Sequence, residues 1–154
     1  MIRIIAVLLS LTSFYFSTKK EEVKELRQLF YKATENSDSS TTLFNKLSSA
    51  NNQSPAIIFG YKGMSYLLEA KHSYNVYQKF SYFNRGKSIL DSAINMDPKN
   101  RELRFFRYSV QDNAPSFLGY NKELKVDKAK ILLKIEAEED SDLKYKINEY
   151  FNSK

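Results

Sequence analysis

The chain has no cysteine and no tryptophan, a single histidine (His72), four glycines and three prolines among its 154 residues. Without cysteine it cannot form disulfides, bind a metal through thiolates or use a cysteine nucleophile. One histidine is too few for the usual zinc sites, and no paired-carboxylate site, catalytic triad or cofactor motif stands out. We therefore expect no catalytic residue, no metal and no cofactor, and we predict that the protein is not an enzyme.

The scarcity of glycine and proline favours helices over a β-sandwich or a barrel. Tyrosine and phenylalanine number 11 each, so aromatic burial should dominate the packing energy. Lysine and arginine exceed aspartate and glutamate by 24 to 18, which gives a net charge of +6. The lysines are scattered and do not form a basic stripe with aromatics, so we expect no nucleic-acid partner.

Residues 1–17 have the pattern of a signal peptide. Arg3 supplies the positive start, and an apolar run over residues 4–11 follows, too short to span a bilayer comfortably. We expect a protein exported to the periplasm or secreted, with one domain over residues 18–154 and membrane contact only through the leader. A buried N-terminal helix and an uncleaved membrane anchor are the alternatives.

The clearest helix is expected over residues 75–96. Asn75 is a good N-cap, Pro98 cannot continue the helix, and Asn100 can cap the next one. Two neighbouring apolar stripes at steps of three and four residues indicate that this helix touches neighbours on two sides. One stripe contains Val76, Phe80, Phe83, Leu90 and Ile94, with Lys87 interrupting it, and the other contains Tyr82, Gly86, Ile89, Ala93 and Met96. We expect it to be the longest helix of the mature chain and to pack antiparallel against residues 56–71.

Apolar periodicity predicts six further helices, and no segment has the alternation of a strand. These helices are expected over residues 19–35, a short segment with Leu43 and Leu47, and residues 56–71, 101–112, 126–136 and 143–151. A break is expected at residues 36–40. The loop over residues 113–120 is unusually apolar and should pack down through Phe117, Leu118 and Tyr120. The helix over residues 126–136 should turn Val126, Ala129, Leu132 and Leu133 inward.

The expected helices over residues 56–71 and 75–96 resemble a tetratricopeptide repeat, whose pattern combines aromatic, small and bulky residues at fixed spacing with a closing proline. The matching residues are Phe59, Gly63 and Tyr66 in the first helix and Gly86, Leu90, Ala93 and Pro98 in the second. Lys62 stands where the family prefers leucine, and the helix from Arg101 fits the pattern poorly. Gly86 follows Tyr66 by 20 residues where the family has about nine, so about eleven extra residues can lengthen both helices.

The resemblance implies an all-α fold, in which antiparallel helical hairpins stack as a short tetratricopeptide-like α-solenoid. It also implies a concave helical surface that binds a protein or peptide. From it we expect an exported helical-repeat scaffold or adaptor without catalytic activity. The alternative is a small-ligand-binding or enzyme-accessory protein of the cell envelope. An open groove would favour the first, and a closed aromatic pocket would favour the second.

Arg104, Arg107 and Gln111 are the first candidate binding residues. Their spacing of three and seven residues puts them on one side of a helix, next to its apolar stripe. Together they could bind an anion such as the carboxylate at a peptide end. Alternatively the arginines are structural and bind the carbonyls of the loop over residues 113–120, or a carboxylate such as Glu69.

Tyr66 and Tyr77 are the second candidates, because tyrosine offers contact area at low entropic cost. Within a set of five nearby tyrosines, each could equally fill a helical core, and we expect some to be exposed. The acidic run over residues 138–142 lacks the glycine and the spacing of a calcium loop. Asp140 or Ser141 more simply caps the last helix.

Overall fold

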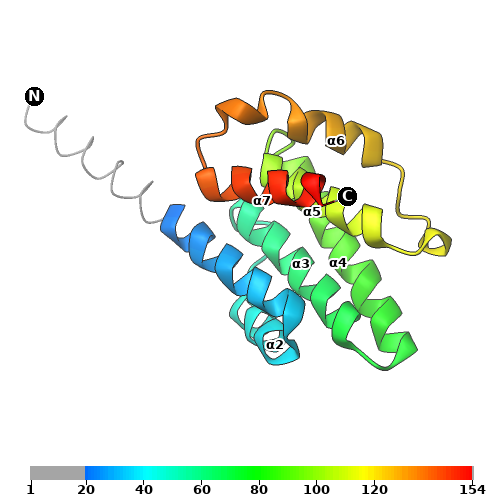
Figure 1. Ribbon diagram of the computed structural model, residues 1–154. Helices are drawn as coiled ribbons and strands as arrows, with labels where there is room; N and C mark the ends of the chain where they lie inside the picture. Colours follow the sequence, from blue (N-terminus) through cyan, green and yellow to red (C-terminus); the bar gives the residue numbers. More distant parts are fainter. Residues whose placement is uncertain (1–19, 154) are drawn as a thin grey trace, which may run out of the picture.

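The protein is all-helical throughout the residues that the structure describes. The computed structural model describes residues 20–153, so the expected signal peptide lies outside this range. Seven α-helices follow one another there, with no strand between them (Figure 1). They cover residues 20–35, Ser37–Lys46 (α2), Ala56–His72 (α3), Val76–Met96 (α4), Arg101–Asn113 (α5), Leu124–Leu132 (α6) and Ser141–Asn152 (α7). Two short 3-10 helices, Ser116–Leu118 (η1) and Ile135–Ala137 (η2), flank α6.

The antiparallel hairpin of α3 and α4 is the centre of the fold, as the sequence predicts. With 21 residues, α4 is the longest helix of the described chain, and the Asn75 side chain caps it. The two backbones meet at Gly63 and Gly86. A Cβ on Gly63 would lie 2.9 Å from the Leu90 nitrogen, and one on Gly86 would lie 2.7 Å from the Gly63 oxygen. Any side chain would push the helices apart, so this contact explains the two glycines.

The first two helices are separated by one residue, which corrects the predicted five-residue break at residues 36–40. Asn36 alone leaves helical geometry, with an extended backbone, and its side chain accepts a hydrogen bond from the Ser39 N–H at 2.9 Å. An asparagine that caps the next helix directly is enough to turn the chain. The serines that follow therefore belong to the first turn of α2.

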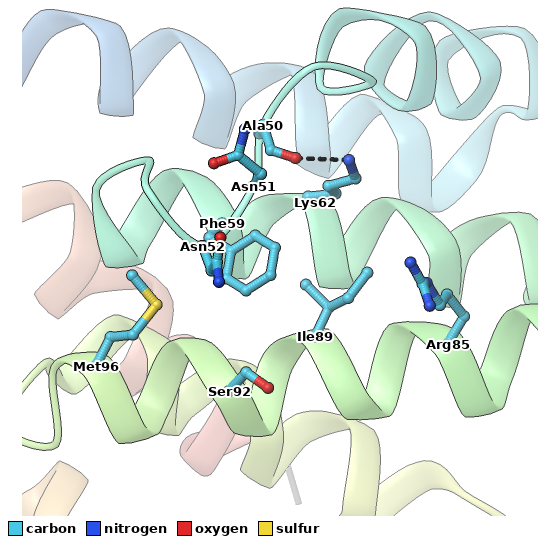
Figure 2. A pocket seen from close by; sticks show the side chains of 9 residues that line it. All are labelled: Ala50, Asn51, Asn52, Phe59, Lys62, Arg85, Ile89, Ser92 and Met96. Atoms are coloured by element: carbon cyan, nitrogen blue, oxygen red, sulfur yellow. Dashed lines mark hydrogen bonds between the residues drawn. The ribbon is translucent and has the colours of Figure 1, made fainter.

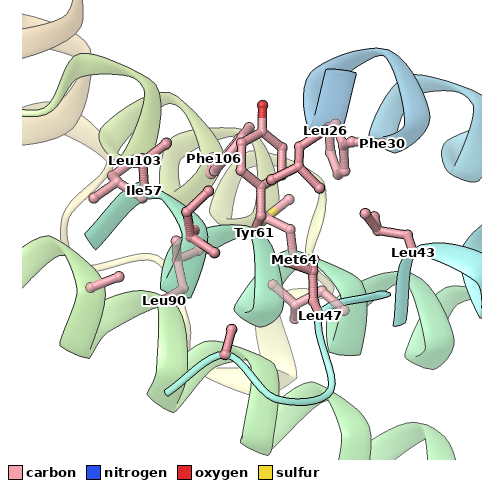
Figure 3. Close-up of a cluster of buried hydrophobic side chains, with 14 of the residues drawn as sticks. Leu26, Phe30, Leu43, Leu47, Ile57, Tyr61, Met64, Leu90, Leu103 and Phe106 are labelled. Atoms are coloured by element: carbon pink, nitrogen blue, oxygen red, sulfur yellow. The ribbon is translucent and has the colours of Figure 1, made fainter. Parts of the chain in front are cut away.

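The main core lies between the helix over residues 20–35 and α2, α3, α4 and α5, with Tyr61 near its middle (Figure 3). The Tyr61 ring packs edge-on against Phe106, with ring centroids 4.9 Å apart, and against Phe30 at 6.1 Å. A smaller core joins α5, α6 and α7. Its buried residues are Phe105, Tyr108, Ile131, Leu143 and Ile147.

A buried arginine ties the first helix to α5 and α7. Arg27 donates from Nε and Nη2 to the two carboxylate oxygens of Glu102, both at 2.8 Å. It also donates to Asp140 at 3.0 and 3.1 Å and to Asp142 at 2.8 Å. The Tyr61 hydroxyl donates to the same Glu102 at 2.6 Å. One cation thus holds three carboxylates from two distant parts of the chain.

The protonation states in this cluster follow from its contacts. Burial lowers the pKa of Arg27, but hydrogen bonds to the carboxylates raise it by a larger amount, so the net shift is upward. Burial, together with the nearby Glu102 charge, raises the pKa of Tyr61 and keeps its hydroxyl a donor. Burial also raises the pKa of Asp140, but hydrogen bonds from Arg27 and the Leu143 N–H lower it below its usual value. Asp140 also caps α7 as predicted.

α6 presents a different side to the protein from the one predicted. Val126, Leu132 and Leu133 are exposed, and so is Ala129. The residue that turns inward with Ile131 is Asp127, four positions earlier, and both are completely buried. The prediction was wrong because it assigned the apolar residues to the core, whereas the charge of Asp127 orients this helix.

The loop after α5 packs through one residue only. Tyr120 is buried, and its ring meets Phe83 of α4 edge-on at a centroid distance of 6.0 Å. Phe117 is exposed and Leu118 is half-buried, so the prediction that both are buried was wrong. The η1 turn closes on itself and ends at Gly119 with a left-handed backbone, which leaves the Phe117 ring outside.

Candidate functional site

The three polar residues predicted on α5 lie together, and Asp127 of α6 binds both arginines. Arg104 donates from Nη1 to Asp127 at 2.8 Å, and it donates to the Pro98 carbonyl at 2.6 and 2.8 Å. Arg107 donates to both Asp127 oxygens at 2.7 and 2.9 Å. Gln111 is buried, and its Oε1 has no hydrogen-bond partner among the described residues. Two guanidinium groups thus surround one buried carboxylate.

The other partners of this cluster differ from those predicted. Arg107 also donates to Asp91 of α4 at 3.3 Å, and the Tyr120 hydroxyl donates to the same oxygen at 2.9 Å. The expected acceptors, Glu69 and the carbonyls of the loop after α5, are not the ones that the arginines bind. Glu69 instead accepts from the Ser40 hydroxyl at 2.7 Å. An arginine selects whichever carboxylate the fold brings near, and its partners were too distant in sequence to identify.

The arginine cluster therefore holds helices together within the folded chain. Burial lowers the pKa of Arg107, but its bonds to Asp127 and Asp91 raise the pKa by a larger amount, so the guanidinium group stays charged. Burial and the Asp91 charge likewise raise the pKa of Tyr120. An incoming anion would have to displace Asp127 from two cations. This geometry favours the structural interpretation of Arg104 and Arg107 over an open anion site.

The two candidate tyrosines have different environments. Tyr66 is half-buried on α3, and its ring contacts Phe44 at a centroid distance of 4.8 Å and Tyr82 at 6.0 Å. Tyr77, in the first turn of α4, is 88% exposed. Tyr66 therefore contributes to packing between α2, α3 and α4, whereas the Tyr77 ring is available to an external partner.

Tyr77 belongs to a larger exposed patch at the start of α4, which we call the distal surface. Its members are Tyr74, Val76, Tyr77 and Phe80. Val76 is 75% exposed and Phe80 is 57% exposed, although the sequence pattern placed both in a buried stripe. Four neighbouring large apolar side chains turned to solvent form a feature that usually marks an interaction site.

The distal surface continues a stripe that is buried further along the same helix. Phe83, Leu90 and Ile94 follow Phe80 at helical spacing, and Leu90 and Ile94 are buried in the main core. α4 has 21 residues and α5 has 13, a difference of eight, or about 12 Å at 1.5 Å per residue. Figure 1 shows the hairpin of α3 and α4 extending beyond α5. The start of the stripe is bare because its neighbour is too short to cover it.

The stretch of chain that carries the distal surface contains cations but no carboxylate. No aspartate or glutamate occurs between Glu69 and Asp91 along the chain, a stretch that includes Lys79 and Lys87. Lys79 is exposed, and Lys87 interrupts the stripe, where its Nζ lies 5.4 Å from the centroid of the Tyr120 ring. The bare apolar residues are therefore bordered by cations that no carboxylate of the same stretch neutralises.

A hollow of about 550 Å³ lies on another side of the hairpin, between α3, α4 and the loop before α3 (Figure 2). Lys62 points into this region, but its Nζ donates to the carbonyls of Ser48 at 2.7 Å and Ala50 at 2.6 Å. Lys62, which departs from the tetratricopeptide pattern, thus fixes that loop. Exposed Arg85 and Met96 border the hollow, which is a groove on the surface rather than an aromatic-lined cavity.

Residues 20–153 contain no group of histidine and acidic side chains arranged to hold a metal ion. Within the same range, no helix combines the length and the apolar character needed to cross a bilayer. His72 ends α3, and its Nε2 lies 2.9 Å from the Ala33 carbonyl oxygen, which places it in a helix-to-helix contact.

Comparison of the chain with protein-family models, with curated proteins and with solved structures gives no match.

Proposed function

We propose that this protein is a non-catalytic helical module that binds a segment of another protein through the distal surface of α4. The observation that carries the proposal is the apolar stripe of α4, buried at Leu90 and bare at Val76 and Phe80. Exposing these side chains to water is unfavourable by about 25 cal/mol per Å² of apolar area, and a partner that covers them recovers this free energy. Tyr77 adds a ring with a polar end, a combination common where proteins bind.

The proposal includes a tetratricopeptide-like arrangement of the central hairpin. The contact between Gly63 and Gly86 supports it, because these are the small positions at which the repeat brings its helices together. The helix stop at Pro98 occupies the closing position of the pattern. In a helical solenoid each hairpin leaves one side for the next, and a lengthened α4 leaves part of that side uncovered.

Export is part of the same proposal and rests on residues 1–17 alone. A reporter fused after residue 40 that is active only outside the cytoplasm should be active with the native leader. It should be inactive when Arg3 and the apolar run that follows are replaced by polar residues. Reporter activity without the leader would contradict export through this segment.

The alternative, a small-ligand-binding or enzyme-accessory protein, has less support. The hollow bordered by Arg85 and Met96 is open, and its lysine is already bound to loop carbonyls. A drug-sized ligand is usually buried over most of its surface in a largely apolar cavity. The groove offers too little enclosure for that.

Site-specific photo-crosslinking tests the protein-binding proposal. A photoreactive phenylalanine analogue replaces Tyr77 in the full chain, and the matched control carries it at Tyr145, an exposed tyrosine of α7. We expect an adduct with one protein from Tyr77 only, lost when Phe80→Ser is added. No protein adduct from Tyr77, or equal adducts from both positions, would contradict the proposal.

A further inference from the structure

The partner of the distal surface can be described chemically, on the premise of the proposed function. We infer that it is an acidic amphipathic helix, which lies along the first half of α4 in line with α5. Three observations carry this inference: the continuity of the stripe with an internal helix interface, the length left uncovered, and the sign of the neighbouring charges.

The stripe on α4 is built to receive a helix. Val76, Phe80, Phe83, Lys87, Leu90 and Ile94 are spaced alternately by four and three residues, the spacing with which one helix packs along another. α5 supplies that neighbour over the C-terminal half of α4, where Leu90 and Leu103 are both buried in the main core. The same spacing continues past the end of α5, so a second helix placed beyond it would meet equivalent positions.

The uncovered length matches a short helical segment. The eight-residue difference between α4 and α5 corresponds to about two helical turns. Two turns of an amphipathic helix present two to three apolar anchors, enough to cover Val76 and Phe80 and to contact the Tyr77 ring. Phe117 is also exposed, on the loop that packs against α4 through Tyr120.

Charge selects between an acidic partner and a second copy of this chain. Lys79 borders the stripe, Lys87 lies within it, and exposed Lys122 follows Tyr120 by two residues. In a symmetric dimer the same patch faces itself, which would bring these like charges together. A helix with glutamate or aspartate beside its apolar stripe would pair with them and place its apolar residues on Val76 and Phe80.

Two matched peptides test the inference. Both are amphipathic, about 18 residues long so that a helix can form on binding, and carry the same leucine stripe. One has a glutamate-rich polar side and the other a lysine-rich one. Fluorescence anisotropy with the full chain should show the acidic peptide binding at least about tenfold more tightly at low salt, with an affinity that falls as salt rises.

Variants of the protein separate the two contributions. Phe80→Ser should weaken binding of the acidic peptide about tenfold. The pair Lys79→Gln and Lys87→Gln should weaken it similarly and flatten its salt dependence. The matched control, Lys130→Gln with Lys134→Gln on exposed positions in and just after α6, changes the net charge equally and should leave binding unaltered.

The remaining outcomes overturn the inference in distinguishable ways. Equal affinity for both peptides, or no binding of either, rejects the acidic helix, while the Tyr77 crosslink decides the proposed function separately. Binding to phosphatidylglycerol vesicles that is lost with Phe80→Ser and exceeds peptide binding assigns the surface to a membrane. A concentration-dependent dimer that Phe80→Ser abolishes assigns it to a second copy.

Discussion

Two buried ionic clusters hold this protein together, and their charges are arranged in opposite ways. Around Arg27 a single cation binds three carboxylates, whereas around Asp127 a single carboxylate binds two arginines. All three carboxylates of the first cluster bind the same guanidinium group, so the loss of Arg27 leaves Glu102, Asp140 and Asp142 together. The arginines of the second keep other acceptors if Asp127 is lost. We therefore expect the loss of a central residue to destabilise the fold most where the residues around it have no other partner, whatever the number of bonds that are lost.

The largest effect should come from Arg27→Met, which keeps an unbranched apolar stem but removes the charge. Three carboxylates would remain close together without the guanidinium group that binds them, and one of them, Glu102, is buried. We expect the free energy of unfolding to fall by about 3–5 kcal/mol, measured by urea denaturation. Adding Glu102→Gln should recover part of the loss. No recovery would mean that packing, and not charge, dominates at this position.

Asp127→Asn should cost less, about 2–3 kcal/mol in the free energy of unfolding. Arg104 keeps the Pro98 carbonyl and Arg107 keeps Asp91, so neither guanidinium group is left without an acceptor. Urea denaturation of the variant and of the unchanged protein would measure this difference. If this variant loses more stability than Arg27→Met, the proposed contrast between the clusters is wrong.

Acid should weaken the Arg27 cluster by a smaller amount. Because the pKa of Asp140 is lower in the folded protein than its ordinary value of 3.8, the folded state favours the carboxylate. Its contribution is complete above the ordinary value and is lost as the pH falls below it toward the folded pKa. Asp140→Asn should therefore make stability less dependent on pH in that acidic range. An unchanged pH profile of urea midpoints would contradict this assignment.

The smallest effect is expected for Asp142→Asn. The Asp142 side chain is 43% exposed, so water screens its ion pair with Arg27. Exposed pairs contribute about 0–1 kcal/mol, and we expect the free energy of unfolding, measured by urea denaturation, to fall by an amount at the low end of this range. A loss as large as that of Asp127→Asn would show that all three carboxylates act as one unit.

The sequence was sufficient for the regular parts of the fold. Asn75 and Asn100 have the capping residue type just before an apolar period, and both cap the helices predicted for them. Gly63 and Gly86, which match small positions of the tetratricopeptide pattern, lie where the two helices of the hairpin meet. These features depend on residues within a few positions of one another, or on a pattern that repeats along one helix.

Long-range ionic contacts could not be predicted in the same way. Arg27 bonds to Asp140 and Asp142, which lie 113 and 115 residues away, and no local pattern connects them. The predicted orientation of α6 was wrong for the same reason, since Asp127 turns inward to bind two arginines of α5. An acidic residue in an amphipathic helix is normally on the solvent side.

The distal surface was present in the sequence but was assigned to the wrong environment. The stripe through Val76 and Phe80 has the same spacing whether or not a neighbour covers it. The signal that could have shown its exposure was the mismatch in length between the expected helix over residues 75–96 and the next one over residues 101–112. The candidate Tyr77 was selected for its residue type alone, and its exposure required coordinates.

The contact between Arg27 and the start of α7 also limits when the Arg27 cluster can form during folding. During synthesis Arg27 emerges early, and Asp140 and Asp142 emerge more than a hundred residues later. Contacts of such long sequence separation form slowly, because most of the chain must be ordered before they do. Until then the first helix lacks two of the three carboxylates that fix it in place. The segment from Asp140 to α7 therefore completes the Arg27 cluster last, after Glu102 of α5 has been synthesised.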